Sequence, residues 1–171
     1  MCFAHLAKEG ATAVVSGGVQ TYTISIGNSG SVTYRSPKEL TVQDQLPAGV
    51  TATAVSPVDC LDSASCIQLG VAGALLTCTL NLNTNLNPGT NTTSGPTFSI
   101  TATMPTTAGD LTNWASIDPA GGAAYPGPVN CTLPPCAQQT TTIQALPAPL
   151  LTITKAAPII VNAGTRLRRT R

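Results

Sequence analysis

The sequence is poor in charged residues, aromatic rings and histidine. Charged residues make up 9% of the 171 positions and aromatic residues 4%, whereas an ordinary soluble domain carries roughly 25% charged residues. His5 is the single histidine, and the sequence gives little support for a Ser–His–Asp catalytic triad. The cysteines show neither a CxxC spacing nor a histidine pair, so the sequence predicts no zinc site. No Lys-Ser/Thr pair follows the glycine-rich stretches, so we also expect no phosphate-binding loop. Taken together, these features lead us to expect no cofactor and no conventional enzyme.

Basic charge is concentrated at one end of the chain. Four of the eight basic residues lie in the last six positions, and the rest of the chain carries four basic and seven acidic side chains, a net charge of −3. We interpret the arginine cluster at 166–171 as a solvated tail, and without a basic stripe along the body nucleic acid is not an expected partner. No run of eighteen apolar residues occurs, so direct membrane insertion is not expected. Residues 1–6 lack a signal-peptide pattern, and we therefore take the chain as a fragment of an exported protein.

What the sequence has in abundance is period-two alternation between apolar and hydroxyl side chains. In residues 22–26 the large apolar residues share one parity, and Thr23 and Ser25 share the other, as in a strand with one buried face. Strand-like runs of this kind occur at 22–26, 40–46, 50–55, 75–80, 98–104, 111–117 and 138–143, with Gly, Pro, Asn and Asp between them. Their number and spacing predict an all-β protein, an immunoglobulin-like antiparallel β-sandwich of about seven to eight strands.

Six cysteines in so small a chain indicate disulfides and an oxidising compartment, so we expect an extracellular or cell-surface location. Cys131 and Cys136 are close enough in sequence to close a small loop at a hairpin tip. Cys78 lies in a strand-like run, and either Cys60 or Cys66 in the preceding loop is its expected partner. The cysteine left over pairs with the N-terminal cysteine or stays unpaired.

The start of the chain recurs near its end. Lys8 and Gly17 have counterparts in Lys155 and Gly164, each displaced by 147 positions. The Pro-Ala-Pro stretch between the copies has the composition of a short, stiff linker. We therefore predict one repeat at 1–146 with a hairpin insertion at 121–144, a linker at 147–149, and the truncated start of a second repeat at 150–171.

Several motifs occur in a fixed order along residues 3–118. They are Lys8 ending the first strand, Gly17 or Gly18 before the Thr21–Ile24 strand, the Asn-x-Gly turn at Asn28–Gly30, the Asp-x-Leu-Pro-x-Gly motif at Asp44–Gly49, and the Thr-Asn-x-Ala strand at Thr112–Ala115. In this order they resemble the prokaryotic conserved-repeat domain, known as domain of unknown function eleven. The resemblance implies an immunoglobulin-like fold that recurs in tandem on secreted and cell-surface proteins. It also implies a stalk or adhesin role, while the 121–144 hairpin departs from the family's short form.

Three polar residues share parity with apolar neighbours and are therefore expected to point into the sandwich. They are Lys8, Asp44 and Asn113, and burying them apart would be costly, so we expect them to meet. One outcome, as in similar bacterial surface domains, is an intramolecular isopeptide bond. A neutral Lys8 amine would attack the Asn113 carboxamide while a protonated Asp44 polarises the carbonyl and moves protons. The alternatives are a buried ion pair hydrogen-bonded to an amide, or strand-end side chains that reach water.

The function expected from these features is mechanical. Sandwiches joined end to end would project an adhesive tip or form part of a surface fibre, with neighbouring repeats of the same chain as partners. A different class of function is a binding module for surface glycans or proteins, carried by the 121–144 hairpin with Trp114 and Tyr125 as a stacking platform. A third is an accessory domain of a secreted hydrolase. For Lys8, Asp44 and Asn113, parity fixes which face of its strand each side chain occupies but not how far apart the side chains lie.

Overall fold

The computed structural model describes residues 4–117, 136–147 and 153–155, and within these ranges it contains ten β-strands and no helix. The expected fold class, an immunoglobulin-like all-β sandwich, is confirmed. In chain order the strands are β1 (Ala4–Glu9), β2 (Ala13–Val15), β3 (Val19–Asn28), β4 (Lys38–Gln45), β5 (Thr51–Asp59), β6 (Leu61–Ile67), β7 (Leu75–Leu82), β8 (Thr97–Thr103), β9 (Gly109–Ile117) and β10 (Cys136–Gln144). The described residues accordingly include no apolar helix long enough to cross a membrane.

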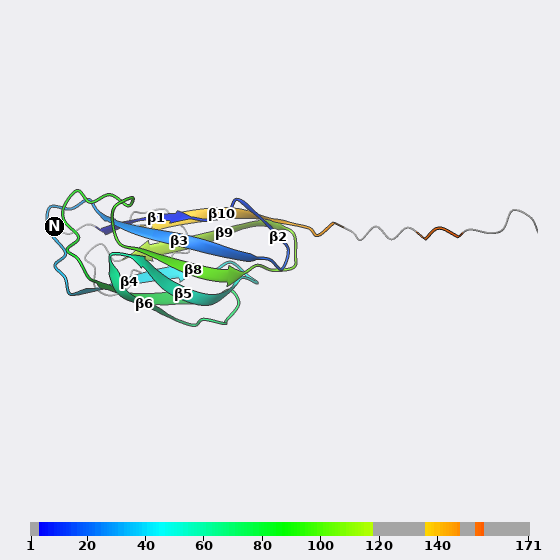
Figure 1. Cartoon of the computed structure of the whole chain (residues 1–171), viewed down its shortest axis with the longest axis horizontal. Coiled ribbons are helices and arrows are strands. Elements are labelled where there is room, and N and C mark those ends of the chain that lie inside the picture. The colour runs from blue at the N-terminus through cyan, green and yellow to red at the C-terminus, as the bar shows by residue number, and fades with distance from the viewer. Residues whose placement is uncertain (1–3, 118–135, 148–152, 156–171) are drawn as a thin grey trace, which may run out of the picture.

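The strands form two sheets that face each other (Figure 1). The smaller sheet has the order β1-β3-β8-β5 and the larger one β2-β10-β9-β4-β7-β6. All pairings between neighbouring strands are antiparallel except that of β2 with the end of β10, which is parallel. The chain therefore crosses repeatedly between the layers, and side chains from both sheets meet in a single core.

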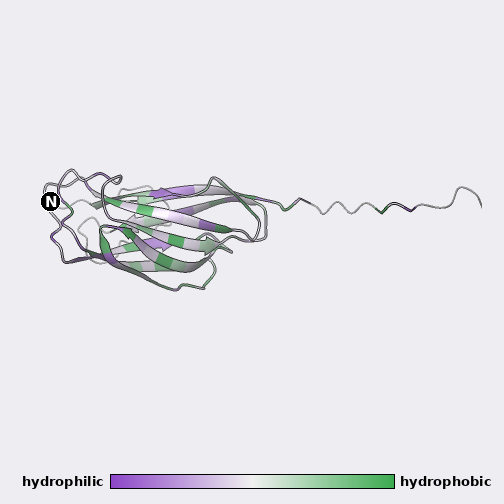
Figure 2. Ribbon diagram, viewed as in Figure 1, coloured by the Kyte–Doolittle hydropathy of each residue, from purple (hydrophilic) through white to green (hydrophobic). Residues whose placement is uncertain are grey.

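The core follows from the alternation read in the sequence. Along β3, Tyr22, Ile24 and Ile26 are fully buried, and along β4 Leu40 and Val42 are fully buried as well. Figure 2 shows hydrophobic and hydrophilic positions alternating along the strands, as expected when one face of each strand packs inward. Burial of one parity fixes the register, because a slip by one residue would turn every apolar side chain outward.

A tight turn follows β4, close to Asp44 near the end of that strand. The amide of Val50 donates to the carbonyl of Pro47 at 3.0 Å, closing a four-residue turn. Gly49 has φ +81°, a left-handed conformation that glycine adopts without the strain imposed by a side chain. This turn carries the chain from β4 in the larger sheet to β5 in the smaller one, immediately beyond the site described below.

The first and last described strands run in the same direction. β2 follows β1 closely and pairs in parallel with residues 142–144 of β10, and the amide of Ser16 donates to the carbonyl of Gln144 at 2.8 Å. In Figure 1, β1 begins near the N-terminus at one end of the sandwich and β10 leads out at the opposite end. β10, whose residues fall within the range expected for the 121–144 hairpin, lies between β9 and β2 in the larger sheet and pairs with both. Residues 121–135 fall outside the described ranges.

Candidate functional site

Three strands from both sheets bring Lys8, Asp44 and Asn113 into the interior. Lys8 lies on β1 of the smaller sheet, while Asp44 and Asn113 lie on β4 and β9 of the larger sheet. Their exposed fractions are 6%, 0% and 0%. Each occupies the inward parity of its strand, because its neighbours two residues away belong to the apolar face.

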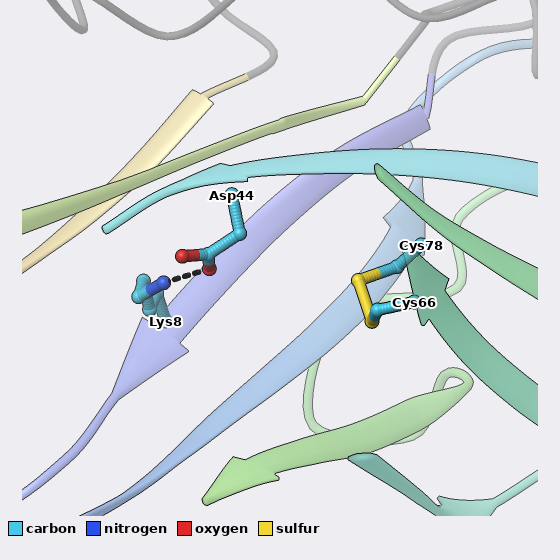
Figure 3. Close-up of a disulfide and its surroundings, with 4 residues drawn as sticks. All are labelled: Lys8, Asp44, Cys66 and Cys78. Carbon is cyan, nitrogen blue, oxygen red and sulfur yellow. Dashed lines mark hydrogen bonds and ion pairs between the residues drawn. A yellow bond between two sulfur atoms is a disulfide. The ribbon is translucent and has the colours of Figure 1, made fainter. Parts of the chain in front are cut away.

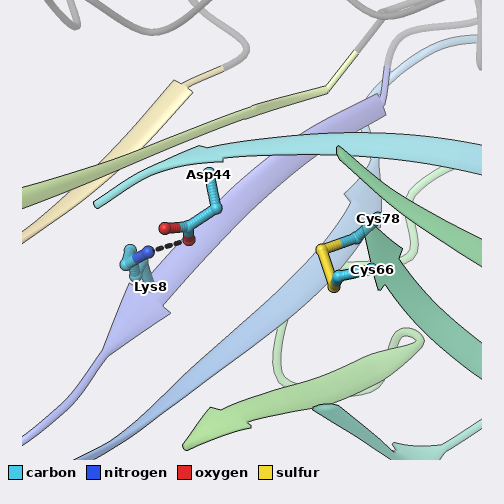
Figure 4. Close-up of polar contacts among 4 residues, drawn as sticks. All are labelled: Lys8, Asp44, Cys66 and Cys78. Atoms are coloured by element: carbon cyan, nitrogen blue, oxygen red, sulfur yellow. Dashed lines mark hydrogen bonds and ion pairs between the residues drawn. A yellow bond between two sulfur atoms is a disulfide. The ribbon is translucent and has the colours of Figure 1, made fainter. Parts of the chain in front are cut away.

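Lys8 and Asp44 form a buried ion pair across the two sheets. The Lys8 ammonium donates a hydrogen bond to Asp44 Oδ2, and both side chains are fully buried. Figure 4 shows the two side chains pointing toward each other from β1 and β4. The Lys8 nitrogen also lies over the ring of Tyr22, 4.9 Å from its centroid, where the face of the aromatic ring favours positive charge.

Asn113 lies beside this pair with its side chain unbonded. β4 and β9 are neighbours, and Asp44 is paired with Ala115, which places Asn113 two residues further along β9 on the same face. β1 of the opposite sheet packs against β9. Among the described residues, no group makes a hydrogen bond with Asn113 Oδ1 or Nδ2 or with Asp44 Oδ1. Buried polar groups are nearly always hydrogen-bonded, so three such atoms without a partner at one place are unusual.

Burial shifts the pKa of both charged groups toward their neutral forms. Loss of solvation lowers the pKa of Lys8 below its ordinary 10.5, against the opposing effects of the Asp44 charge and hydrogen bond. Loss of solvation likewise raises the pKa of Asp44 above 3.8, against the opposing effects of Lys8 and Asn113. A single proton moved along their hydrogen bond converts the ion pair into a free amine and a carboxylic acid. Burial thus brings the neutral pair closer in free energy to the ion pair.

A second group of buried polar atoms borders the pair. Gln20 Nε2 donates to Thr141 Oγ1 at 3.1 Å, and Thr141 Oγ1 donates to the carbonyl of Ala11 at 2.9 Å. The Tyr22 hydroxyl is buried and has no hydrogen-bond partner in the described part of the chain. Burial raises its pKa and the Asp44 charge adds to the rise, while Thr141 and, to a smaller extent, Asn113 oppose it. The sequence analysis did not assign these residues to the site, but Gln20 shares the buried parity of Tyr22, which is a usable signal.

The structure joins Cys66 on β6 to Cys78 on β7, one of the two pairings expected for Cys78 (Figure 3). The two residues are direct register partners with a Cα–Cα distance of 4.0 Å. Cys60, of intermediate burial, forms no disulfide with the other described cysteines. Cys136 is disulfide-bonded, and its expected partner, Cys131, lies outside the described residues.

The remaining candidates are not brought into this site. Trp114 is half-buried on the outer face of β9, where its register partners are Gln45 and Gln138. Tyr125, its expected companion in a glycan-stacking platform, lies outside the described residues. His5 packs against Gly27 on the neighbouring strand rather than beside an acid and a nucleophile. Within the described ranges, no three His, Cys, Asp or Glu side chains are grouped as metal ligands.

Comparison with known proteins supports the fold. The structure is similar to a non-cellulosomal cohesin from Archaeoglobus fulgidus, with a TM-score of 0.50 and 11% identity over 84% of this chain and 92% of the cohesin. It is also similar to a cohesin module of a family 33 glycoside hydrolase from Clostridium perfringens, with a TM-score of 0.53 and 8% identity over 85% of this chain and the whole of that module. No family model and no curated protein sequence matches the chain. At these identities the likeness establishes the sandwich fold, and the resemblance to the conserved-repeat domain stays a prediction.

Proposed function

We propose that the protein is a force-resisting, immunoglobulin-like module of a secreted or cell-surface prokaryotic protein, and that an isopeptide bond between Lys8 and Asn113 ties its two sheets together. The observation that carries this proposal is the buried Lys8–Asp44 pair beside an Asn113 carboxamide whose two polar atoms are both unbonded. An ordinary structural ion pair has no need of a neighbouring unbonded amide, because such an amide is costly in a dry core.

The nucleophile in this reaction is the Lys8 amine. Burial lowers the pKa of Lys8, which favours the free amine over the ammonium. The Lys8 nitrogen attacks the side-chain carbonyl carbon of Asn113, and the new carbon–nitrogen bond places negative charge on Oδ1. The amine approaches from the smaller sheet while the carboxamide belongs to the larger one, so the product is a covalent bond between the layers.

Asp44 transfers the proton. As a carboxylic acid it donates a hydrogen bond that polarises the Asn113 carbonyl, and its raised pKa favours this protonated form. When the tetrahedral intermediate collapses, the bond from the carbonyl carbon to Nδ2 breaks, and a proton from the Lys8 nitrogen reaches Nδ2 by way of Asp44. One ammonia leaves, and a secondary amide remains. The reaction needs no oxidant and no cofactor, because its atoms and electrons balance within the three side chains.

The position of the bond suits a module under tension. In Figure 1 the chain enters β1 at one end of the sandwich and leaves β10 at the opposite end, so force applied at the two ends of the chain enters through β1 and leaves through β10. A bond from β1 to β9 would fix the first strand to the neighbour of the last strand. Tandem copies joined in this way would form a stiff stalk with neighbouring repeats as partners. One similar structure is named as a module of a larger glycoside hydrolase, which supports a modular setting for this chain.

The intact mass of the reduced protein tests the proposal. We expect a deficit of about 17 Da from the sequence mass, corresponding to one ammonia lost, that persists after the disulfides are reduced. Lys8→Ala and Asn113→Ala should each restore the full mass. Lys38→Ala on β4 and Asn81→Ala on β7 are matched controls at exposed or half-exposed positions and should keep the deficit. A wild-type protein of full mass after reduction would refute the isopeptide bond.

A further inference from the structure

Buried polar groups connect the end of β10, where the chain leaves the sandwich, to two other parts of the fold. Thr141 on β10 is 0% exposed and Gln20 on β3 is 3% exposed. Gln20 Nε2 donates to Thr141 Oγ1 at 3.1 Å and to the carbonyl of Ala11 at 3.4 Å, and Thr141 Oγ1 donates to the same carbonyl at 2.9 Å. We call these three groups the Thr141 clamp. It joins β10 of the larger sheet, β3 of the smaller sheet and the connection from β1 to β2.

The residue before Ala11 is suited to this arrangement. A Cβ atom on Gly10 would lie 2.5 Å from Gln20 Nε2, which is closer than such atoms approach, so an alanine there would push the Gln20 amide out of its place. Glycine at position 10 therefore lets Gln20 reach both of its acceptors.

With Lys8 joined to Asn113, tension takes a short path through the module. It runs through residues 4–8, across the isopeptide bond and through residues 113–144, while the closed loop between Lys8 and Asn113 carries none. β10 is the last strand on this path, and in Figure 1 the chain leaves it along the long axis of the sandwich. Tension therefore pulls β10 along its own axis.

The neighbours of this end of β10 lie inside the unloaded loop. Residues 140–143 pair with residues 109–112 of β9, and residues 142–144 pair with β2. Hydrogen bonds of an antiparallel pair lie across the strands, so a pull along β10 loads those to β9 together. Extension thus requires β10 to slide past two stationary strands, and the Thr141 clamp adds an attachment to a third, β3.

We propose that the Thr141 clamp prevents β10 from sliding out when the crosslinked module is under tension. This inference rests on the proposed function, because it assumes a module that carries force. A slide of one residue would turn the inward side chains of β10 outward. A slide of two residues would bring the Thr141 hydroxyl to the place of Ile143 in the apolar core and leave Gln20 Nε2 without one of its acceptors. Both movements break the clamp at the start of the extension.

Force-clamp measurements on the full chain, held by its two ends under reducing conditions, test the proposal. The 35 residue intervals outside the loop, 4 in β1 and 31 from Asn113 to Gln144, give the crosslinked module a step of about 13 nm. Thr141→Val keeps the side-chain volume but loses two buried hydrogen bonds, so we expect the time before this step to fall roughly 10-fold at the same force. Thr141→Ser keeps the hydroxyl and should stay close to wild type. Thr21→Val, at an exposed position on β3, is the matched control and should behave as wild type.

A second pulling geometry separates the clamp from general stability. With one handle at the N-terminus and the other at Ser65, an exposed residue of β6 inside the loop, tension bypasses β10. There Thr141→Val should keep the wild-type lifetime. Equal shortening in both geometries would mean that Thr141 supports the whole fold, and it would overturn the proposed clamp.

The length and the lifetime of the step separate this inference from the isopeptide bond. A wild-type step of about 13 nm, with equal lifetimes for wild type and Thr141→Val, refutes the clamp and leaves the bond standing. A wild-type step of about 50 nm, the extended length from Ala4 to Gln144, refutes the bond. The clamp then falls as well, because its load path begins at Asn113.

Discussion

Pulling the protein by its two ends should reveal the isopeptide bond as missing length. A bond from Lys8 to Asn113 closes a loop of 105 residue intervals that force cannot extend. Each interval contributes about 3.6 Å when fully extended, so the bond hides about 38 nm of contour. From Ala4 to Gln144 the uncrosslinked chain has 140 intervals and would extend to about 50 nm, of which only about 13 nm would remain available in the crosslinked protein.

Single-molecule force spectroscopy measures this difference directly. Wild type and Asn113→Ala would be pulled under reducing conditions, so that disulfides hide no length in either protein. Without reductant the Cys66–Cys78 disulfide hides 12 further intervals, about 4 nm, in the Asn113→Ala variant. In wild type that disulfide lies inside the loop that the isopeptide bond already closes, so its reduction should release nothing.

Equal extensions for the two proteins would refute the crosslink. A shortening of wild type by a length other than about 38 nm would place a bond between different residues. Asn81→Ala, an exposed asparagine on β7, is the control and should extend as wild type does. The result depends only on which residues are joined, so it does not require the unfolding force to be known.

Three further predictions follow from the same site and from the disulfide. The rate of bond formation should show a bell-shaped dependence on pH, because the reactive pair carries one proton. The raised pKa of Asp44 places the acid limb of the curve above 3.8, and the lowered pKa of Lys8 places the alkaline limb below 10.5. Mass spectra of samples stopped at fixed times at each pH measure both limbs. Asp44→Ala should abolish the 17 Da loss. Because it leaves Lys8 buried without its partner, it should also lower the free energy of unfolding, measured by urea titration, by about 3–5 kcal/mol relative to Asn113→Ala. An unchanged free energy of unfolding would contradict the buried pair. In the Asn113→Ala background, Cys66→Ala should lower the free energy of unfolding by about 3 kcal/mol in the same assay, because it opens the loop of 12 residue intervals that the bond to Cys78 closes. A decrease below about 1 kcal/mol would argue against this disulfide.

Much of the fold could be predicted because the alternation is strong where the strands are buried on one face. β3, β4, β5, β7, β8, β9 and β10 overlap the seven runs recognised in the sequence. The strands that were missed lie at the two edges of the larger sheet. β2 has three residues, too few to show a period, and β6 is largely exposed, so its Asp-Ser-Ala-Ser stretch has no continuous apolar face. Edge strands need less apolar area, and their sequence signal is correspondingly weak.

The site could be predicted only in part, for a different reason. Parity assigns Lys8, Asp44 and Asn113 to the interior, since it depends only on local backbone geometry. Whether they meet depends on the order of strands in two separate sheets and on how those sheets are superimposed, which no local pattern contains. Tyr22 illustrates the limit: its parity and its apolar neighbours make it an ordinary core residue in the sequence, and only the pairing of β1 with β3 places its ring under the Lys8 nitrogen.

Thermodynamic stability alone gives this cluster no reason to exist. A buried ion pair is often no more stable than well-packed apolar residues of the same size, and here it is accompanied by an amide and a phenol that make no hydrogen bonds. Closing a loop of about 100 residues covalently contributes roughly 4.7 kcal/mol by restricting the unfolded chain, which offsets the cost of burying these groups once the bond has formed. The larger consequence is mechanical, because a covalent bond between β1 and β9 does not dissociate at any force that unfolds a sandwich. On the proposed reaction, the polar core of this domain would therefore serve resistance to extension rather than thermodynamic stability.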